Sequence, residues 1–175
     1  MTLRQFYDWQ TAGGGGDVTL LVQTLETLEI PWCMIGGLAV NHWAEESMAT
    51  ADVDLVIATE QIEKAAQALR DAGFKEERFE WSINLIGHSK VSIQIFTGEF
   101  YGEFPAHSVP ADIHGILMRV ASLEDTLKGK IKAWSERTRR TSKRQKDLTD
   151  IARLLETHPE IAAQIPEEIL TRLAD

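Results

Sequence analysis

The chain of 175 residues has little cysteine, a shortage of positive charge and no long apolar run. Its one cysteine, Cys33, lies in an apolar stretch, so disulfides and cysteine-based zinc clusters are excluded and a buried thiol is expected. Eighteen Lys and Arg against 27 Asp and Glu give a formal net charge of -9, which argues against a generally basic, nucleic-acid-coating protein. Because no run approaches the ~20 apolar residues that span a bilayer and no signal peptide is visible, we expect a cytoplasmic protein without a membrane segment.

The remaining composition is that of a globular protein. Hydrophobic residues make up 43% and charged residues 26%, which allows one well-buried core with a helical appendage. The four glycines at 13–16 predict a flexible N-terminal segment over residues 1–16. We expect a core over residues 17–121. A capping-box pattern at Ser122 then marks the start of a helical region, 122–175, packed on that core.

Strand-like and helix-like patterns alternate along the core. Asp17 is the expected N-cap of a first helix, which ends before Pro31. Strands are expected at 32–35, 52–58, within 74–86, at 91–96 and at 115–121, with helices from Gly36 to 43 and over 60–72. The strand within 74–86 is expected to carry four apolar residues on one face, namely Phe79, Trp81, Ile83 and Leu85. Residues 100–113 are interpreted as a loop. This order predicts an α/β fold whose first strands are joined by a right-handed crossover.

Two short motifs carry the chemistry. Gly36 and Gly37 follow the first strand, where backbone amides and the following helix N-terminus can receive a phosphate. Asp52 and Asp54 are two residues apart on the second strand, so their side chains share a face. Two adjacent carboxylates favour a bound hard cation such as Mg²⁺ over the alternative of solvated residues at a strand start. A phosphate site beside a metal site indicates a nucleotide-using enzyme.

The arrangement resembles the nucleotidyltransferase superfamily in its minimal, toxin-like form. The resemblance covers roughly residues 30–157 and depends on four motifs: Gly36-Gly37-Leu38-Ala39-Val40, Thr50-x-Asp52-x-Asp54-Leu55, Leu127-x-x-Lys130-x-x-Ala133 and Lys146-Asp147-x-x-Asp150-Ile151. It implies an α/β (α+β) fold with a mixed β-sheet core, flanking helices and a C-terminal helical extension. It also implies transfer of a nucleoside monophosphate from a nucleoside triphosphate to an acceptor hydroxyl.

The same resemblance assigns the site residues. Asp52 and Asp54 would bind Mg²⁺ or Mn²⁺, and the backbone at Gly36 and Gly37 would bind phosphate. Lys130, Lys146 and Arg137 would stabilise the outgoing phosphates, although an exposed helix lysine is an equally good interpretation of Lys130. RNA, a protein side chain or a small molecule could be the acceptor, and toxin-like relatives imply a cognate partner protein.

Two aspartates and a basic run in the helical region have structural interpretations that involve no metal or nucleotide. Asp147 and Asp150, three residues apart, are expected to form ion pairs with the basic run at 137–144 rather than to bind metal. That run is either a solvated loop between helices or a contact for RNA or nucleotide phosphates.

The strand at 91–96 departs from the pattern of active relatives, which carry a third carboxylate there. Gln94 occupies the expected position, and an amide can coordinate a metal through its oxygen but cannot act as a general base. Two hypotheses follow. The first is an active nucleotidyltransferase with Asp52, Asp54 and Gln94 at its catalytic centre. The second is a catalytically degenerate protein of the same fold that binds a nucleotide or a partner without turnover.

Overall fold

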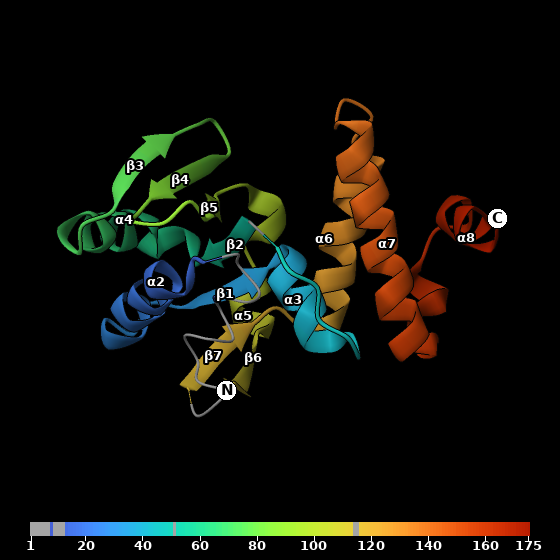
Figure 1. The fold of residues 1–175 in the computed structure, drawn as a ribbon, viewed down its shortest axis with the longest axis horizontal. Coiled ribbons are helices and arrows are strands. Elements are labelled where there is room, and N and C mark those ends of the chain that lie inside the picture. Colours follow the sequence, from blue (N-terminus) through green and yellow to red (C-terminus); the bar gives the residue numbers. More distant parts are fainter. Residues whose placement is uncertain (1–7, 9–12, 51, 114–115) are drawn as a thin grey trace.

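The computed structural model describes residues 8, 13–50, 52–113 and 116–175, and a seven-stranded mixed sheet lies at its centre (Figure 1). The strand order is β3-β4-β5-β2-β1-β7-β6. The strands are β1 (Trp32–Ile35), β2 (Asp52–Ile57), β3 (Lys75–Arg78), β4 (Ser82–Ile86), β5 (Ser92–Phe96), β6 (Val109–Ile113) and β7 (Ile116–Val120). The predicted mixed sheet with flanking helices is confirmed.

Helices flank the sheet and extend beyond it. The α-helices are α2 (Gly15–Thr27), α3 (Gly36–Trp43), α4 (Ile62–Asp71), α5 (Phe104–His107), α6 (Leu123–Ser135), α7 (Thr141–Thr157) and α8 (Glu167–Ala174). Short 3₁₀ turns are η1 (Thr59–Gln61), η2 (Glu99–Tyr101) and η3 (Pro159–Gln164). Within the described ranges, no helix combines the length and the apolar character needed to cross a membrane.

The direction of β2 differs from the prediction. β1 and β2 are antiparallel neighbours, so no right-handed crossover joins them; the parallel pairs are β1 with β7 and β2 with β5. The reason is the course of α3, which packs against α6 and α7 as well as against β1 and β2. Because α3 does not carry the chain back along the sheet, β2 re-enters at the end where β1 finished.

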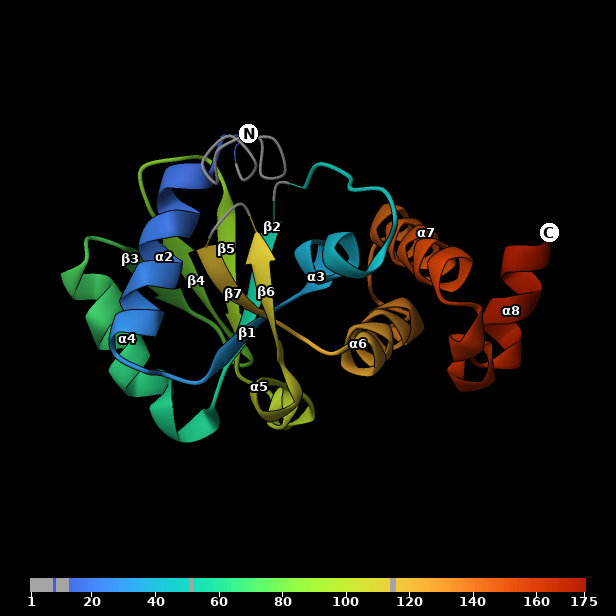
Figure 2. The ribbon, with the colours of Figure 1, turned by 90° about the horizontal axis from the view of Figure 1, so that it is seen from below.

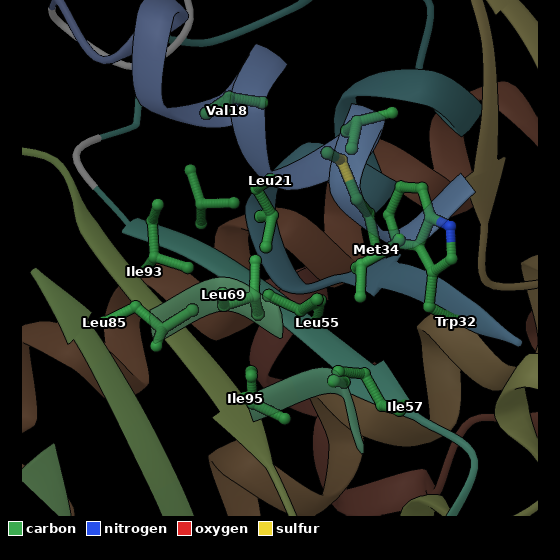
Figure 3. Close-up of a cluster of buried hydrophobic side chains, with 14 of the residues drawn as sticks. Val18, Leu21, Trp32, Met34, Leu55, Ile57, Leu69, Leu85, Ile93 and Ile95 are labelled. Carbon is green, nitrogen blue, oxygen red and sulfur yellow. The ribbon is translucent and has the colours of Figure 1, made fainter. Parts of the chain in front are cut away.

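One face of the sheet forms the main hydrophobic core with α2 and α4. Leu55, Ile57, Ile93 and Ile95 alternate along β2 and β5 and pack against Leu69 of α4 in a fully buried cluster (Figure 3). This alternation turns the intervening side chains of β2 and β5 to the opposite face. Asp52 and Asp54 are among them, so the core fixes the direction in which the two carboxylates point.

The helices after residue 122 form a second cluster on the other side of the molecule (Figure 2). Ser122 caps α6 by accepting a hydrogen bond from the Asp125 amide at 3.1 Å, as the capping-box pattern predicted. Val40 of α3 and Ala44, the C-cap of that helix, belong to this second cluster. Helix α3 therefore joins the sheet to α6 and α7.

Three local predictions are wrong. The segment at 100–113 contains η2, α5 and β6 rather than a loop, because β6 pairs with β7 along its whole length. The segment at 74–86 is a hairpin of β3 and β4. Phe79 and Trp81 lie in its connection and are 54% and 62% exposed, so they do not share a buried face with Ile83 and Leu85.

The third error concerns Asp17, which is not an N-cap. Helix α2 begins at Gly15, three residues earlier than predicted, with Gly14 as its N-cap, and takes in the last two of the four glycines. The first residues of the expected flexible segment, 1–7 and 9–12, lie outside the described residues. Asp17 is 5% exposed, and its carboxylate accepts hydrogen bonds from the His88 amide, the Ser89 amide and the Ser89 hydroxyl. Asp17 therefore ties α2 to the β4–β5 connection.

Replacing Asp17 with Asn is expected to lower the free energy of unfolding by about 1–3 kcal/mol at neutral pH, because buried amides lose their charged acceptor. Burial alone would raise the pKa of Asp17, but the hydrogen bonds from Ser89 and His88 hold that pKa below its ordinary value of 3.8. The carboxylate's contribution is therefore present above pH 3.8 and is lost as pH falls through the lower, folded pKa.

Urea unfolding of wild type and Asp17→Asn between pH 3 and pH 7 measures this difference. The exposed Asp71 on α4 supplies the matched control, Asp71→Asn. Equal losses in both variants at neutral pH would contradict a specific role for Asp17.

Candidate active site

The turn between β1 and α3 requires glycine at its first position. Gly36 has φ +64°, a left-handed conformation that favours glycine. A Cβ built on Gly36 would lie 2.6 Å from Oδ2 of Asp54. Ile35 is the N-cap of α3 and supplies no side-chain hydrogen bond to the helix. The turn therefore presents backbone amides directly beside a carboxylate.

The second glycine faces another polar group. A Cβ on Gly37 would lie 3.4 Å from the Thr50 hydroxyl and 3.7 Å from Nζ of Lys146. The Thr50 hydroxyl in turn contacts the backbone of Asp52. The glycine pair and the start of β2 are thus packed together, as the two motifs predicted.

Asp54 is held in an environment that disfavours its charge. It lies opposite Ile35 in the β1–β2 register. Burial and the negative charge of Asp52 raise the pKa of Asp54 to about 6, against the opposing charges of Lys130, Lys146 and Lys143. Two neighbouring carboxylates whose ionised forms are disfavoured by burial and mutual repulsion are stabilised when a cation lies between them.

Helix α7 delivers ammonium groups to this point. Nζ of Lys143 lies 3.0 Å from Oδ2 of Asp52, and Lys146 lies beside Gly37. Lys146 was predicted as a site residue, whereas Lys143 was assigned only to the basic run. The three-residue spacing that puts both lysines on one face of α7 was the available clue.

Lys130 is neither exposed nor free. Its side chain is 9% exposed and lies 3.3 Å from Asp147 and 2.7 Å from Asp150. Arg139 contacts Asp147 at 2.8 Å, and Arg153 contacts Asp150 at 3.0 Å. Asp147 pairs with Arg139 of the basic run, as predicted, whereas the other partners, Lys130 and Arg153, lie outside that run. This buried network fixes α7 against α6.

Arg137 lies in the connection between α6 and α7 and is exposed. Arg139, two residues later, is the arginine that lines the pocket beside Asp54. The sequence contained both arginines in one basic run, and the path of a short connection decides which of them faces inward.

Gln94 lies directly opposite Asp54 in the parallel β2–β5 pair, so the two side chains are neighbours on one face. Its Nε2 donates a hydrogen bond to the Ser82 hydroxyl at 2.9 Å. Among the residues that the structure describes, no group of three or more His, Cys, Asp and Glu side chains is arranged to hold a metal. Asp52 and Asp54 are therefore a pair of neighbouring carboxylates, and no third acidic side chain is grouped with them in that part of the chain.

A pocket of about 90 Å³ opens beside Asp54 and Gly36, between the sheet and α6. Phe96, Tyr101 and Phe104 line it, together with residues of α6. Burial and the negative charges of Glu136 and Asp54 raise the pKa of the Tyr101 hydroxyl to about 12, so this group stays protonated at neutral pH. Sequence reasoning did not find this pocket.

A mixed sheet that sets a glycine turn against paired carboxylates defines a fold of the nucleotidyltransferase class. The family model described as "Nucleotidyl transferase AbiEii toxin, Type IV TA system" matches residues 19–175, and the chain belongs to this family. No curated protein sequence matches the chain significantly.

Solved structures agree on the fold. ANT(2")-Ia in complex with adenylyl-2"-tobramycin matches with a TM-score of 0.67 and 13% identity over 90% of this chain and 97% of that one. The lincomycin-bound lincosamide antibiotic adenylyltransferase LnuA matches with a TM-score of 0.56 and 14% identity over 79% and 96%. A nucleotidyltransferase-like protein from Paracoccidioides brasiliensis matches with a TM-score of 0.57 and 22% identity over 91% and 84%. At these identities the likeness concerns the fold alone.

Proposed function

We propose that this protein is a divalent-metal-dependent nucleotidyltransferase that moves a nucleoside monophosphate from a nucleoside triphosphate to an acceptor hydroxyl. The observation that carries the proposal is the contact between Gly36 and Asp54, since a Cβ at Gly36 would lie 2.6 Å from the carboxylate. A phosphate received by the turn and a cation received by Asp54 must meet at this point. The family supports nucleotidyl transfer, and the acceptor and metal belong to the proposal.

The oxygen atoms of Asp52 and Asp54 fit Mg²⁺ or Mn²⁺. Mg²⁺ is commonly held by one or two carboxylates and completes its shell with water and substrate phosphates, so a two-carboxylate site suits it. The Lys143 ammonium, 3.0 Å from Asp52, indicates that this position accepts a positive charge. When bound, the metal would neutralise phosphate charge and polarise the phosphoryl group under attack.

The chain's own groups would divide the remaining work. The amides of Gly36 and Gly37 would orient phosphate oxygens, and Lys143 and Lys146 would neutralise their charge. The acceptor hydroxyl oxygen would bond to the α-phosphorus and give its proton to water, the bond from that phosphorus to the oxygen of the β-phosphate would break, and pyrophosphate would leave with that oxygen. Lys130 would act by holding α7, and with it both lysines, in place. The proposed core, 17–121, and helical region, 122–175, would thus each supply part of one site.

RNA, a protein side chain and a small molecule remain the acceptor classes of the proposal, with a cognate partner protein and a cytoplasmic location. The adenylyl-2"-tobramycin and lincomycin complexes concern small-molecule ligands of structural neighbours. The description of the family as a toxin supports a macromolecular acceptor and a partner.

The direct test is transfer of label from α-labelled nucleoside triphosphates to pooled tRNA, protein or aminoglycoside acceptors in Mg²⁺. We expect transfer by wild type and a loss of at least about 100-fold in Asp52→Asn, since a phosphoryl-transfer metal ligand is removed. Asp71→Asn, on the far helix α4, should keep wild-type transfer. Nucleotide binding without transfer to any acceptor would instead favour the catalytically degenerate protein.

Replacing Lys143 with Ala is expected to tighten Mn²⁺ binding several-fold in the absence of nucleotide, because no internal cation then competes for Asp52. The unfolding free energy should change by no more than about 1 kcal/mol, since the pair is partly exposed. Calorimetric Mn²⁺ titration measures the affinity, with the exposed Lys75 replaced by Ala as control. Weaker Mn²⁺ binding in Lys143→Ala would contradict this role.

Replacing Gln94 with Glu is expected to tighten Mn²⁺ binding by about tenfold and to raise the rate of label transfer. The new carboxylate would lie opposite Asp54 in the β2–β5 register and add a third oxygen ligand. Gln94→Ala, which removes the amide without adding charge, is the control. Unchanged Mn²⁺ affinity in Gln94→Glu would indicate that this strand position does not reach the metal site.

A further inference from the structure

Asp52 is held by the described sheet on one side only. The β1–β2 register ends at Ile35 and Asp54, where the chain leaves β1 for the glycine turn, whereas the β2–β5 register continues to Asp52 and Ser92. Asp54 therefore has a paired strand on each side, and Asp52 has one. The position of Asp52 must depend in part on the connection that leads from α3 into β2.

That connection runs out beside α7 before it returns to the sheet (Figure 2). Nη2 of Arg153 donates a hydrogen bond to the Glu46 carbonyl at 2.6 Å, and the Glu45 amide donates to the Thr157 hydroxyl at 3.1 Å. Nη1 of Arg153 donates to Oδ1 of Asp150 at 3.0 Å, and the arginine side chain is only 13% exposed. One guanidinium thus fastens the connection to α7.

Asn41 of α3 completes this anchor. Its Nδ2 donates to the Met48 carbonyl at 2.7 Å, and its Oδ1 accepts from the Met48 amide and from Nη2 of Arg153, both at 2.9 Å. Asn41 is buried. Because both ends of a buried amide are satisfied at once, the backbone of Met48 is held in one place.

The path of contacts continues from Met48 to Asp52. Thr50 is buried against Gly37, and its hydroxyl lies 3.3 Å from the Asp52 amide and 3.2 Å from the Asp52 carbonyl. At the other end of the path, Oδ2 of Asp150 lies 2.7 Å from Nζ of Lys130. One continuous path therefore joins the buried ion pairs between α6 and α7 to the first residue of β2.

We propose that Arg153 and Asn41 are positioning residues that hold the Asp52 carboxylate where it receives the divalent metal. The inference rests on the proposed function, which places that metal at Asp52 and Asp54. Both residues act through the backbone of Met48 and Thr50 and not by contact with the metal. Hydrogen-bonded groups behind a metal ligand typically change metal affinity by about 10–100-fold when they are removed.

The sharpest variant is Arg153→Lys. Lysine keeps a positive charge for Asp150, but it lacks the planar fork that spans Asp150, Asn41 and Glu46 together. Mn²⁺ titration followed by electron paramagnetic resonance, without nucleotide, measures the affinity, and urea unfolding in EDTA shows that each variant is folded. We expect Mn²⁺ to bind about tenfold more weakly to Arg153→Lys and to Asn41→Ala.

Thr157→Val is the matched control. It removes the other hydrogen bond between α7 and the same connection, at Glu45 and farther from Asp52, so Mn²⁺ affinity should stay within about twofold of wild type. An equal loss of Mn²⁺ affinity in Thr157→Val and Arg153→Lys would mean that any loosening of the connection has this effect, and would overturn the specific roles of Arg153 and Asn41.

A double-mutant cycle separates positioning from a general structural effect. In an Asp52→Asn background, Arg153→Lys should weaken Mn²⁺ no further, because the carboxylate that Arg153 positions is absent. A full additional loss in that background would overturn the inference. If Asp52→Asn binds no Mn²⁺, the comparison of Arg153→Lys and Asn41→Ala with Thr157→Val decides.

The outcomes separate this inference from the proposed function. Wild-type Mn²⁺ affinity in folded Arg153→Lys and Asn41→Ala would overturn the positioning roles and leave the proposed function standing. Failure of wild type to bind Mn²⁺ would remove the proposed metal site and, with it, the positioning roles.

Discussion

Replacing Asp54 with Asn should make the protein more stable and abolish its transfer activity. The pKa of about 6 means that the folded environment disfavours the ionised carboxylate, chiefly through burial and then through Asp52. Above pH 6 the neutral amide removes this penalty, and we expect the metal-free protein to gain about 1–3 kcal/mol of unfolding free energy. Label transfer should fall at least about 1,000-fold, because the amide cannot replace a charged metal ligand.

The sign of the pH dependence follows from the raised pKa. Wild type binds a proton at Asp54 in the folded state below pH 6, whereas the unfolded chain does so only below about 3.8. Wild-type stability should therefore rise as pH falls from about 6 towards 3.8, and the advantage of Asp54→Asn should disappear over this range.

Denaturant unfolding in EDTA and in excess Mg²⁺ measures the stability of each variant without and with the metal. Mg²⁺ should stabilise wild type and have little effect on Asp54→Asn, since ligands stabilise only the state that binds them. Asp71→Asn should respond to Mg²⁺ as wild type does. If Asp54→Asn is less stable than wild type in EDTA above pH 6, the like-charged pair is not a source of instability.

The second large effect is expected from Gly36→Ala. The added Cβ would lie 2.6 Å from Asp54 Oδ2, and φ of +64° is unfavourable for alanine. We expect a loss of about 2–4 kcal/mol of unfolding free energy from backbone strain and displacement of the carboxylate. The affinities for Mn²⁺ and nucleoside triphosphate should fall at least about tenfold, because the added Cβ would displace the proposed metal ligand Asp54 and distort the turn proposed to bind phosphate.

Gly73→Ala is the matched control for the strain. Gly73 has φ +108°, and a Cβ there meets no atom within 4 Å, so its cost is backbone strain without a clash. The double variant Gly36→Ala/Asp54→Ala should recover part of the stability by removing the clashing oxygen. Equal stability losses in Gly36→Ala and Gly73→Ala, with no recovery in the double variant, would contradict a close contact between Gly36 and Asp54.

Asp54→Asn and Gly36→Ala are both expected to impair the candidate site, because that site is built from the sheet and from helices together. β2 supplies the carboxylates, the β1–α3 turn supplies the amides, and α7 supplies Lys143 and Lys146. The ion pairs of Lys130 with Asp147 and Asp150 hold α7 at the required place. We therefore propose that Lys130, which the family resemblance implies as a phosphate ligand, instead positions α7 through these ion pairs.

The sequence by itself determined the parts of the site that depend on neighbours along the chain. The two-residue period of a strand puts Asp52 and Asp54 on one face, and two consecutive glycines after a strand allow the tight turn at Gly36. The same local rules placed β5, and with it Gln94, and the start of α6 at Ser122. The mixed sheet and the family came instead from the resemblance of these motifs to the nucleotidyltransferases, and the family model and the seven-stranded sheet confirm both.

Only the tertiary structure decided the direction of β2, the contact of Lys143 with Asp52, the position of Arg139 rather than Arg137 at the pocket, and the existence of the pocket. Each depends on how α3, α6 and α7 pack, which brings Lys143 to Asp52 across 91 residues of chain. Side-chain periodicity says which face of a helix is apolar, but not which distant strand that face meets. Contacts between remote segments are fixed by the packing of the whole core, and a local pattern does not contain them.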